Sequence, residues 1–286
     1  MIRELLSLLG KLVIMVFVLA VLGALFIYLP FENYFNGEFL PIDNFLSEIT
    51  LTIPFVILVN VVLLLTAVFM YFVFERGKGF VLGLQQNKRP VCFLKGIVIT
   101  ILVMGTTFFM VWLFDVVRVD GVNFDMDVAR SLLLGIGIFL VVAIGQELFF
   151  RGYLQEVIGQ HLNIGSGVII SSLLFMGFHF FRYPVHRIVP AVTLFLLGMM
   201  LAITREITGG LWTPLGVYFI WNFIQGSILG FPVSGFHIVE RPLLDISVSG
   251  DHLISGGAYG LMGSVVLAGI LVITIVCLTF EARKLQ

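Results

Sequence analysis

The chain has 286 residues, of which 59% are hydrophobic and only 12% are charged. Soluble domains carry about 25% charged residues, and a soluble fold could not bury so much apolar surface. We therefore interpret the chain as an all-α polytopic membrane protein. Its formal net charge is −1 and it holds no cluster of Lys and Arg that would indicate nucleic-acid binding.

Hydrophobic stretches near the length of a bilayer crossing predict about eight transmembrane helices. In chain order they cover residues 11–30, 51–74, 96–114, 130–150, 166–181, 188–204, 211–231 and 259–280. The first stretch ends at Pro30-Phe31-Glu32, without the small residues of a signal-peptide cleavage site, so we expect it to be retained as a span. The fifth to seventh stretches are short or carry polar residues.

The distribution of Lys and Arg predicts the orientation. With the N-terminus inside, every lysine and most arginines fall on the cytoplasmic side, and segment 75–95 is especially rich in them. We therefore expect both termini to be cytoplasmic, with the plasma membrane as the location. The outer loop 232–258 is long and contains Pro232, Pro242 and several glycines. A re-entrant or surface-lying segment is one interpretation of this loop, but we favour a flexible connector.

Polar residues inside the apolar stretches require an explanation, because a charge in hydrocarbon costs several kcal/mol. Glu147 and Arg151 are four residues apart at the end of the fourth stretch, so on a helix they share a face and can pair. Gln146 lies beside them. These residues indicate either a buried ion pair that fixes packing or a reactive site.

Two further polar groups occur in the fifth and seventh stretches. His179 follows Phe175 by four residues, and Asn222 follows Tyr218 by four, so each pair shares a helix face. Taken singly, His179 and Asn222 are typical of packing residues that hydrogen-bond within a bundle. Together with Glu147, they make a site for water activation and oxyanion binding plausible.

In order and spacing, these residues resemble the CPBP family, which comprises type II CAAX prenyl proteases and bacteriocin-processing or self-immunity proteins and is also called Abi. The likeness rests on Glu147-x-x-x-Arg151 with its Gly-Tyr-Leu continuation, on Phe175-x-x-x-His179 and on Asn222. It implies an intramembrane endopeptidase with no obligatory metal. It also implies that His179 activates water, that Arg151 supports the site, that Glu147 is the second glutamate of the motif, and that Asn222 holds the oxyanion.

Two positions depart from the family pattern. Gln146 stands where the first glutamate is expected, and Tyr218 stands where the last histidine is expected. A tyrosine can still donate to an oxyanion, but a carboxamide cannot accept a proton from water. Three interpretations stay open: Glu147 acts as the base with His179, Gln146 positions water for His179, or the protein is weakly active or inactive.

The leading hypothesis is a peptidase in which Glu147 and His179 activate the water that hydrolyses a membrane-associated protein or peptide. Its site is built from Gln146, Glu147, Arg151, His179, Tyr218 and Asn222. Its alternative is a catalytically inactive membrane scaffold or regulator. We expect three regions: an N-terminal three-helix region (1–129), a CPBP-like core (130–231) built from the fourth to seventh helices, and an outer loop with the last helix (232–286). The sequence does not indicate the oligomeric state.

No cofactor or metal is predicted. Cys92 and Cys277 are far apart and lack a Cys-x-x-Cys partner, so they indicate neither a disulfide framework nor a thiolate site. A metallopeptidase would need about three protein ligands, whereas His179 and Glu147 supply two. The other histidines map to expected loops: His161, His186, His237 and His252. A transporter is less favoured because the polar groups cluster in three helices.

Overall fold

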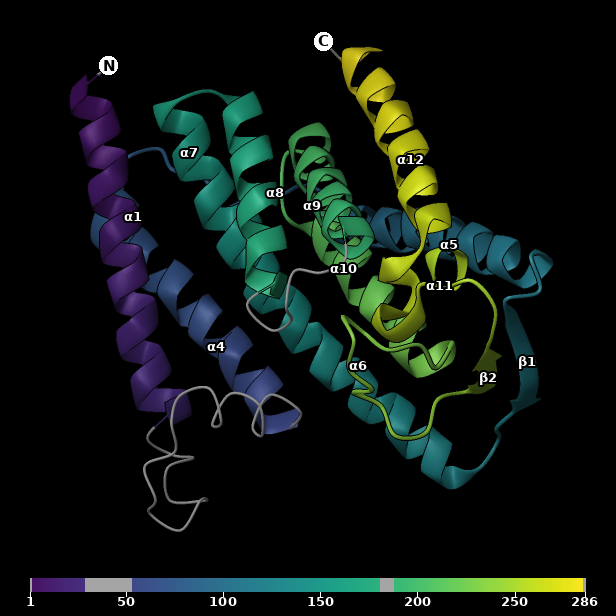
Figure 1. Cartoon of the computed structure of the whole chain (residues 1–286). Coiled ribbons are helices and arrows are strands. Elements are labelled where there is room, and N and C mark those ends of the chain that lie inside the picture. The colour runs from purple at the N-terminus through teal and green to yellow at the C-terminus, as the bar shows by residue number, and fades with distance from the viewer. Residues whose placement is uncertain (1, 29–52, 181–187, 285–286) are drawn as a thin grey trace.

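The computed structural model describes residues 2–28, 53–180 and 188–284 and shows a bundle of helices with one small sheet (Figure 1). The described elements are, in chain order, α1 (Ile2–Gly23), η1 (Ala24–Tyr28), α4 (Ile53–Met70), η3 (Tyr71–Glu75), α5 (Arg89–Leu113), β1 (Val117–Val122), α6 (Met126–Glu147), η4 (Leu148–Gln155), α7 (Glu156–His161), α8 (Ile164–Phe180), α9 (Ile188–Thr208), α10 (Trp212–Phe223), η5 (Ile224–Ile228), β2 (Leu244–Val248), α11 (His252–Ser255), η6 (Gly257–Gly263) and α12 (Val265–Lys284).

The helical bundle agrees with a polytopic membrane protein. Within the described residues, six helical stretches are long and apolar enough to cross a bilayer: Arg3–Phe26, Ile53–Glu75, Arg89–Leu113, Met126–His161, Ile188–Thr208 and Gly257–Glu281. The expected fifth and seventh stretches fall on α8 and α10, which are shorter, with 17 and 12 residues. The count of eight spans therefore stays a prediction, as does the assignment of the core to the fourth through seventh.

The fourth expected stretch, 130–150, ends too early. Helix α6 continues without interruption through η4, a π-helical segment, into α7 and ends at His161. The sequence pattern stops at Arg151 because charged and polar residues follow it. In the structure Arg151 and Gln155 are buried against other helices and find partners there, so the helix does not need to end. π-helical segments are rare and frequently occur at functional sites.

Close helix crossings at glycines fix the helices that carry the polar residues. A Cβ at Gly145 would lie 2.3 Å from the carbonyl oxygen of Asn60, so α6 crosses α4 directly beside Gln146. A Cβ at Gly216 would lie 2.2 Å from the carbonyl oxygen of Phe93, so α10 crosses α5 near Tyr218. Small residues at such crossings let helix backbones approach closely, which replaces the hydrophobic drive that lipid cannot supply.

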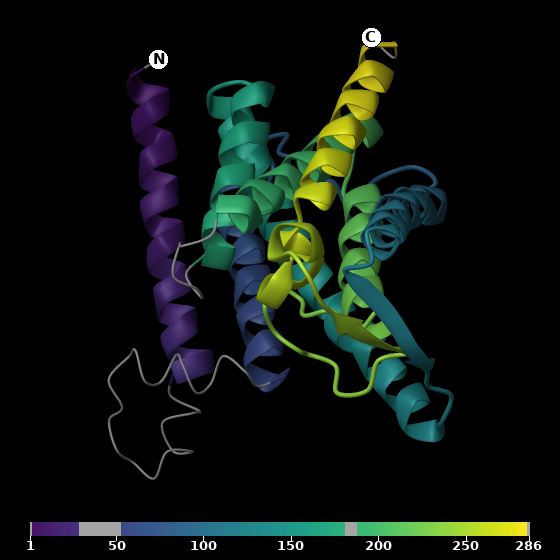
Figure 2. The ribbon, with the colours of Figure 1, turned by 45° about the vertical axis from the view of Figure 1, so that its right-hand side comes forward.

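The expected flexible connector at 232–258 is wrong for much of its length. Strand β2 pairs antiparallel with β1 from Val117↔Val248 to Val122↔Leu244, with an irregularity between Val119 and Gly121. The chain then forms α11 and the turn η6, which is buried at its end and packs on α9. Figure 2 shows the sheet beside α6, at the end of the bundle away from the C-terminus. The glycines and prolines of segment 232–258 therefore form turns within a folded segment.

Helix α1 lies at the outside of the bundle, where it packs on α4 and α7 (Figures 1 and 2). Its docked face carries Leu8, Leu12, Met15 and Leu19, which join the hydrophobic core. Lys11 lies on the same face, and its Nζ is 2.6 Å from Oε1 of Glu75, a carboxylate with 4% of its side chain exposed. Lipid is as apolar as the leucine stripe, so the ion pair is the specific contact that holds α1 in place.

Replacing Lys11 by methionine is expected to lower the free energy of unfolding by about 1–3 kcal/mol, because it leaves the buried carboxylate of Glu75 without its cation. Unfolding in mixed detergent micelles measures the change. Lys78→Met is the matched control, since Lys78 is exposed and donates only to the nearby carbonyl of Phe74. Equal stability of the two variants would contradict the role given to the ion pair.

Candidate active site

Glu147 and Arg151 form a fully buried ion pair at the start of η4. Nη1 of Arg151 lies 3.1 Å from Oε1 of Glu147, and both side chains are 0% exposed. Nη2 of Arg151 donates to the carbonyl oxygen of Gly198 on α9 at 3.1 Å. The guanidinium carbon also lies 4.3 Å from the ring centroid of Phe175 on α8. Arg151 therefore joins three helices and neutralises the carboxylate within the bundle.

Gln146, which directly precedes Glu147, meets Tyr218 and His179. The hydroxyl of Tyr218 donates to Oε1 of Gln146 at 2.8 Å and lies 3.3 Å from Nε2 of His179. Nδ1 of His179 lies 2.8 Å from the carbonyl oxygen of Phe175. A carbonyl oxygen only accepts, so Nδ1 carries the proton of the neutral ring, and the single proton of the Tyr218 hydroxyl has two acceptors within reach, Oε1 of Gln146 and Nε2 of His179.

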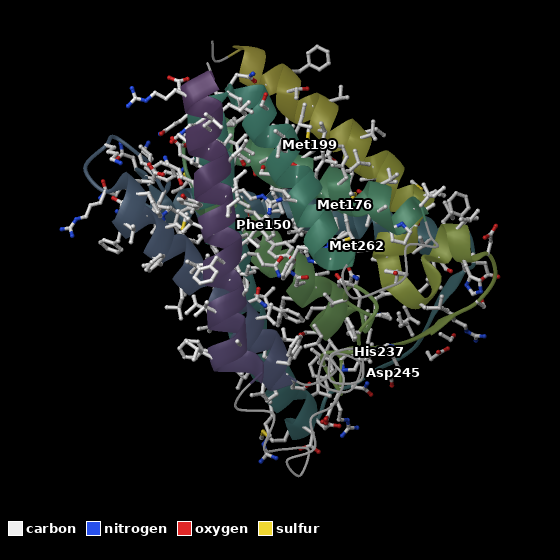
Figure 3. The ribbon with its side chains drawn as sticks, turned by 60° about the vertical axis from the view of Figure 1, so that its left-hand side comes forward. Phe150, Met176, Met199, His237, Asp245 and Met262 are labelled. Carbon is white, nitrogen blue, oxygen red and sulfur yellow. The ribbon has the colours of Figure 1, made fainter. Side chains whose placement is uncertain are left out.

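Phe175 explains why an aromatic residue precedes His179 by one turn. Its carbonyl oxygen fixes the histidine tautomer, and its ring packs against Arg151, against the His179 ring at 4.5 Å and against the Tyr218 ring at 5.6 Å. Phe150 of η4 closes the other side, with its centroid 5.4 Å from that of Phe175. Figure 3 shows the labelled Phe150 at about mid-height of the bundle, near Met176 of α8. Aromatic rings thus pack against Arg151, His179 and Tyr218.

Asn222 lies one turn after Tyr218 on α10 and is 3% exposed. Its Nδ2 donates to the carbonyl oxygen of Tyr218 at 2.8 Å. This bond uses one of the two carboxamide hydrogens and leaves the other to donate elsewhere.

The structure places the six predicted residues on three separate stretches of helix: α6–η4, α8 and α10. Direct contacts join Gln146, His179 and Tyr218 in one group and Glu147 with Arg151 in another. The adjacency of Gln146 and Glu147 in the chain connects the two groups. The two residues that depart from the family pattern, Gln146 and Tyr218, are therefore direct hydrogen-bonding partners.

The metal-ligand candidates of the sequence do not gather. Among the described residues, no group of three His, Cys, Asp or Glu side chains lies close enough to hold an ion. His237 lies well away from Phe150 in Figure 3. His161 ends α7 and His252 begins α11, so these two are helical and not in loops as expected. His186 lies outside the described residues.

Sequence reasoning missed Gln155 and Glu206. Gln155 is 2% exposed, and its Nε2 donates to the carbonyl oxygen of Ala202 at 3.1 Å and to Oε1 of Glu206 at 2.7 Å. The available signal was the four-residue repeat Glu147, Arg151, Gln155, which continues one helix face beyond the expected end of the fourth stretch.

Comparison with known proteins bears on this site. Residues 128–224 match the family model described as type II CAAX prenyl endopeptidase Rce1-like, and this range contains all six predicted site residues. No curated protein and no solved structure shows significant similarity to the chain. The match confirms the resemblance found in the three motifs. The similarity of the chain to the CPBP family, of the Rce1-like type II CAAX prenyl endopeptidase kind, therefore extends over residues 128–224.

Proposed function

We propose that the protein is an intramembrane peptidase that hydrolyses a peptide bond of a membrane-associated protein or peptide, with His179 as the base that activates water. The observation that carries this proposal is the 2.8 Å contact between Nδ1 of His179 and the carbonyl oxygen of Phe175. With the proton on Nδ1, the lone pair of the neutral ring is on Nε2, the nitrogen beside Tyr218. Among the three interpretations of Gln146, this geometry favours the one in which Gln146 positions the water.

In this mechanism a water molecule sits between Gln146 and Nε2 of His179. The imidazole takes a proton from the water as its oxygen attacks the peptide carbonyl, and the imidazolium then protonates the departing amine. The hydroxyl of Tyr218 and the second Nδ2 hydrogen of Asn222 donate to the oxyanion. Glu147 pairs with Arg151 through Oε1 and keeps the guanidinium in place, while His179 accepts the proton.

The test compares cleavage of candidate membrane peptides by wild type, His179→Ala and Glu147→Gln in membranes. Loss of a positioned base costs about 10²–10⁴ in rate, so His179→Ala is expected to lose cleavage by that factor. Glu147→Gln is expected to keep most of it, because a carboxamide oxygen still accepts from Arg151. The same cleavage rate in all three proteins would contradict the assignment of His179.

A second candidate is a catalytically inactive scaffold or regulator. It is favoured by the hydrogen bond between Gln146 and Tyr218. In this bond the only proton of the Tyr218 hydroxyl is donated to the carboxamide oxygen of Gln146. In this alternative the site residues bond to one another, and a partner helix binds at the same place. Absence of cleavage by wild type, together with cleavage by a variant that carries the family residues at both positions, would support it.

The proposal includes the orientation predicted by the charges: both termini in the cytoplasm of a cell with the protein in its plasma membrane. Terminal epitope tags should then be cut by protease in inverted vesicles and protected in right-side-out ones. Tags that are cut only in right-side-out vesicles would reverse the orientation.

A further inference from the structure

A line of polar side chains extends from the site along the contact between η4 and α9. Arg151 and Gln155 lie one turn apart and donate to the carbonyl oxygens of Gly198 and Ala202, which are also one turn apart. At the far end, Arg205 pairs with Glu156 and Glu206. We call this contact the η4–α9 seam, defined by Glu147, Arg151, Gln155, Gly198, Ala202, Arg205 and Glu206.

Four buried polar atoms in the seam have no hydrogen-bond partner among residues 2–28, 53–180 and 188–284. They are Oε2 of Glu147, Nε of Arg151, Oε1 of Gln155 and Nε of Arg205. The residues that carry them are 0%, 0%, 2% and 7% exposed. Almost all buried polar atoms in proteins have a partner, either in the protein or in an ordered water. Four such atoms along one helix contact therefore point to a ligand that satisfies them.

The chemistry of the four atoms selects the ligand. Along the seam they alternate between acceptor and donor: a carboxylate oxygen, a guanidinium N–H, a carboxamide oxygen and a second guanidinium N–H. A cation beside Glu147 would be repelled by Arg151, and an anion beside Arg151 would be repelled by Glu147. A small neutral molecule that both donates and accepts fits every position, and buried water makes two to four such bonds.

The seam also connects the site with the surface. Its inner end is the fully buried Glu147, directly beside Gln146. Its outer end is formed by Glu206 and Glu156, whose side chains are 31% and 19% exposed. Gln146 and Glu147 are 4% and 0% exposed, so a hydrolase with its site there needs a path for its second substrate, because lipid supplies almost no water.

We propose that a file of ordered waters occupies the η4–α9 seam and brings water from the membrane surface at Glu206 to the site at Gln146. Gln155 is the positioning residue at its midpoint: Nε2 holds α9 through Ala202, while Oε1 accepts from the file. The use of this water in hydrolysis rests on the proposed function, whereas the file itself does not.

Radiolytic hydroxyl labelling of the full-length protein in lipid nanodiscs tests the file. Synchrotron X-rays convert bound water to hydroxyl radicals that oxidise side chains beside it. Phe175 is 0% exposed and its ring lies 4.3 Å from the Arg151 guanidinium, so bulk radicals do not reach it. Oxidation of Phe175 in wild type is expected. No oxidation of Phe175 above the unirradiated background would overturn the proposal without recourse to any variant.

Gln155→Leu and Gln160→Leu form the matched pair of variants. Gln160 is exposed on α7 and bonds only to Glu156 of the same helix. Gln155→Leu is expected to lose the Phe175 label, whereas Gln160→Leu keeps it. The label on Met104, which is 0% exposed on α5, should be the same in all three proteins and reports an intact fold. Equal Phe175 oxidation in the two variants would overturn the route through Gln155.

Cleavage measured on the same samples separates this proposal from the proposed function. The protein could cleave no peptide and still show labelling of Phe175 that depends on Gln155. This outcome supports the water file and contradicts the proposed peptidase function. If the protein does cleave, Gln155→Leu is expected to lower kcat and leave KM unchanged. The variant reduces the supply of water to the site and does not change the contacts that bind the peptide.

Discussion

Arg151→Met is expected to lower the free energy of unfolding by about 3–5 kcal/mol, because removal of one partner of a buried ion pair leaves an uncompensated charge. The uncompensated group is Glu147, which is 0% exposed and has Arg151 as its ion-pair partner. The variant also removes the donor to Gly198 and the cation beneath which Phe175 packs. Reversible unfolding in mixed micelles, or the yield of folded protein from membranes, measures the loss.

Two controls define the source of this effect. Arg130→Met breaks an ion pair with Asp127 whose side chains are 72% and 60% exposed, and such pairs contribute only about 0–1 kcal/mol. The double variant Glu147→Leu/Arg151→Met removes both charges and should be more stable than Arg151→Met alone. If the single variant is as stable as wild type, the buried ion pair does not hold η4 against α9.

Gln146→Glu together with Tyr218→His is expected to raise cleavage, by less than the roughly 10²–10⁴ that one positioned general base contributes, because His179 already acts as the base in wild type. The two side chains contact each other at 2.8 Å, so a change at one alters the partner of the other. In the double variant a carboxylate can take the water proton, and an imidazole N–H replaces the phenol as a donor. Rates of the four proteins in the cycle, measured on one membrane peptide, give the coupling between the positions.

The single variants provide the comparison for this experiment. Gln146→Glu alone sets a second carboxylate beside the buried Glu147, and Tyr218→His alone removes the donor that Gln146 accepts from. We therefore expect each single variant to cleave more slowly than the double variant. A double variant that is no faster than wild type would show that the departures from the family pattern do not limit catalysis.

The class of the molecule was predictable from the chain alone, and the chain also supplied the candidate site residues as a prediction. The composition indicates a membrane protein. A chain with 59% hydrophobic and 12% charged residues has too few polar side chains to cover the surface of a soluble fold. Helical spacing predicted the pairing of Glu147 with Arg151, and the structure confirms it. The three motifs predicted the family, which the match over residues 128–224 confirms. These inferences depend only on local spacing and on the high cost of polarity in hydrocarbon.

The extent of η4 and the fold of the outer segment were not predictable in this way. A hydrophobicity pattern ends where polar residues begin, but Arg151 and Gln155 remain inside because backbone carbonyls of α9 accept from them. The glycines and prolines after residue 231 indicate turns, yet β2 forms because β1, more than a hundred residues earlier, offers it a hydrogen-bonding edge. Both features depend on partners that are distant in the sequence.

The sequence by itself indicated a membrane protein that is similar to the CPBP family over residues 128–224, and it proposed six side chains as the candidate site. Only the tertiary structure decided that Gln146 contacts Tyr218, that His179 is held in one tautomer by Phe175, and that four unpartnered polar atoms extend from the site along α9. The physical reason is that spacing along a helix fixes which residues share a face. Which helix meets that face is fixed by packing, through crossings such as those at Gly145 and Gly216.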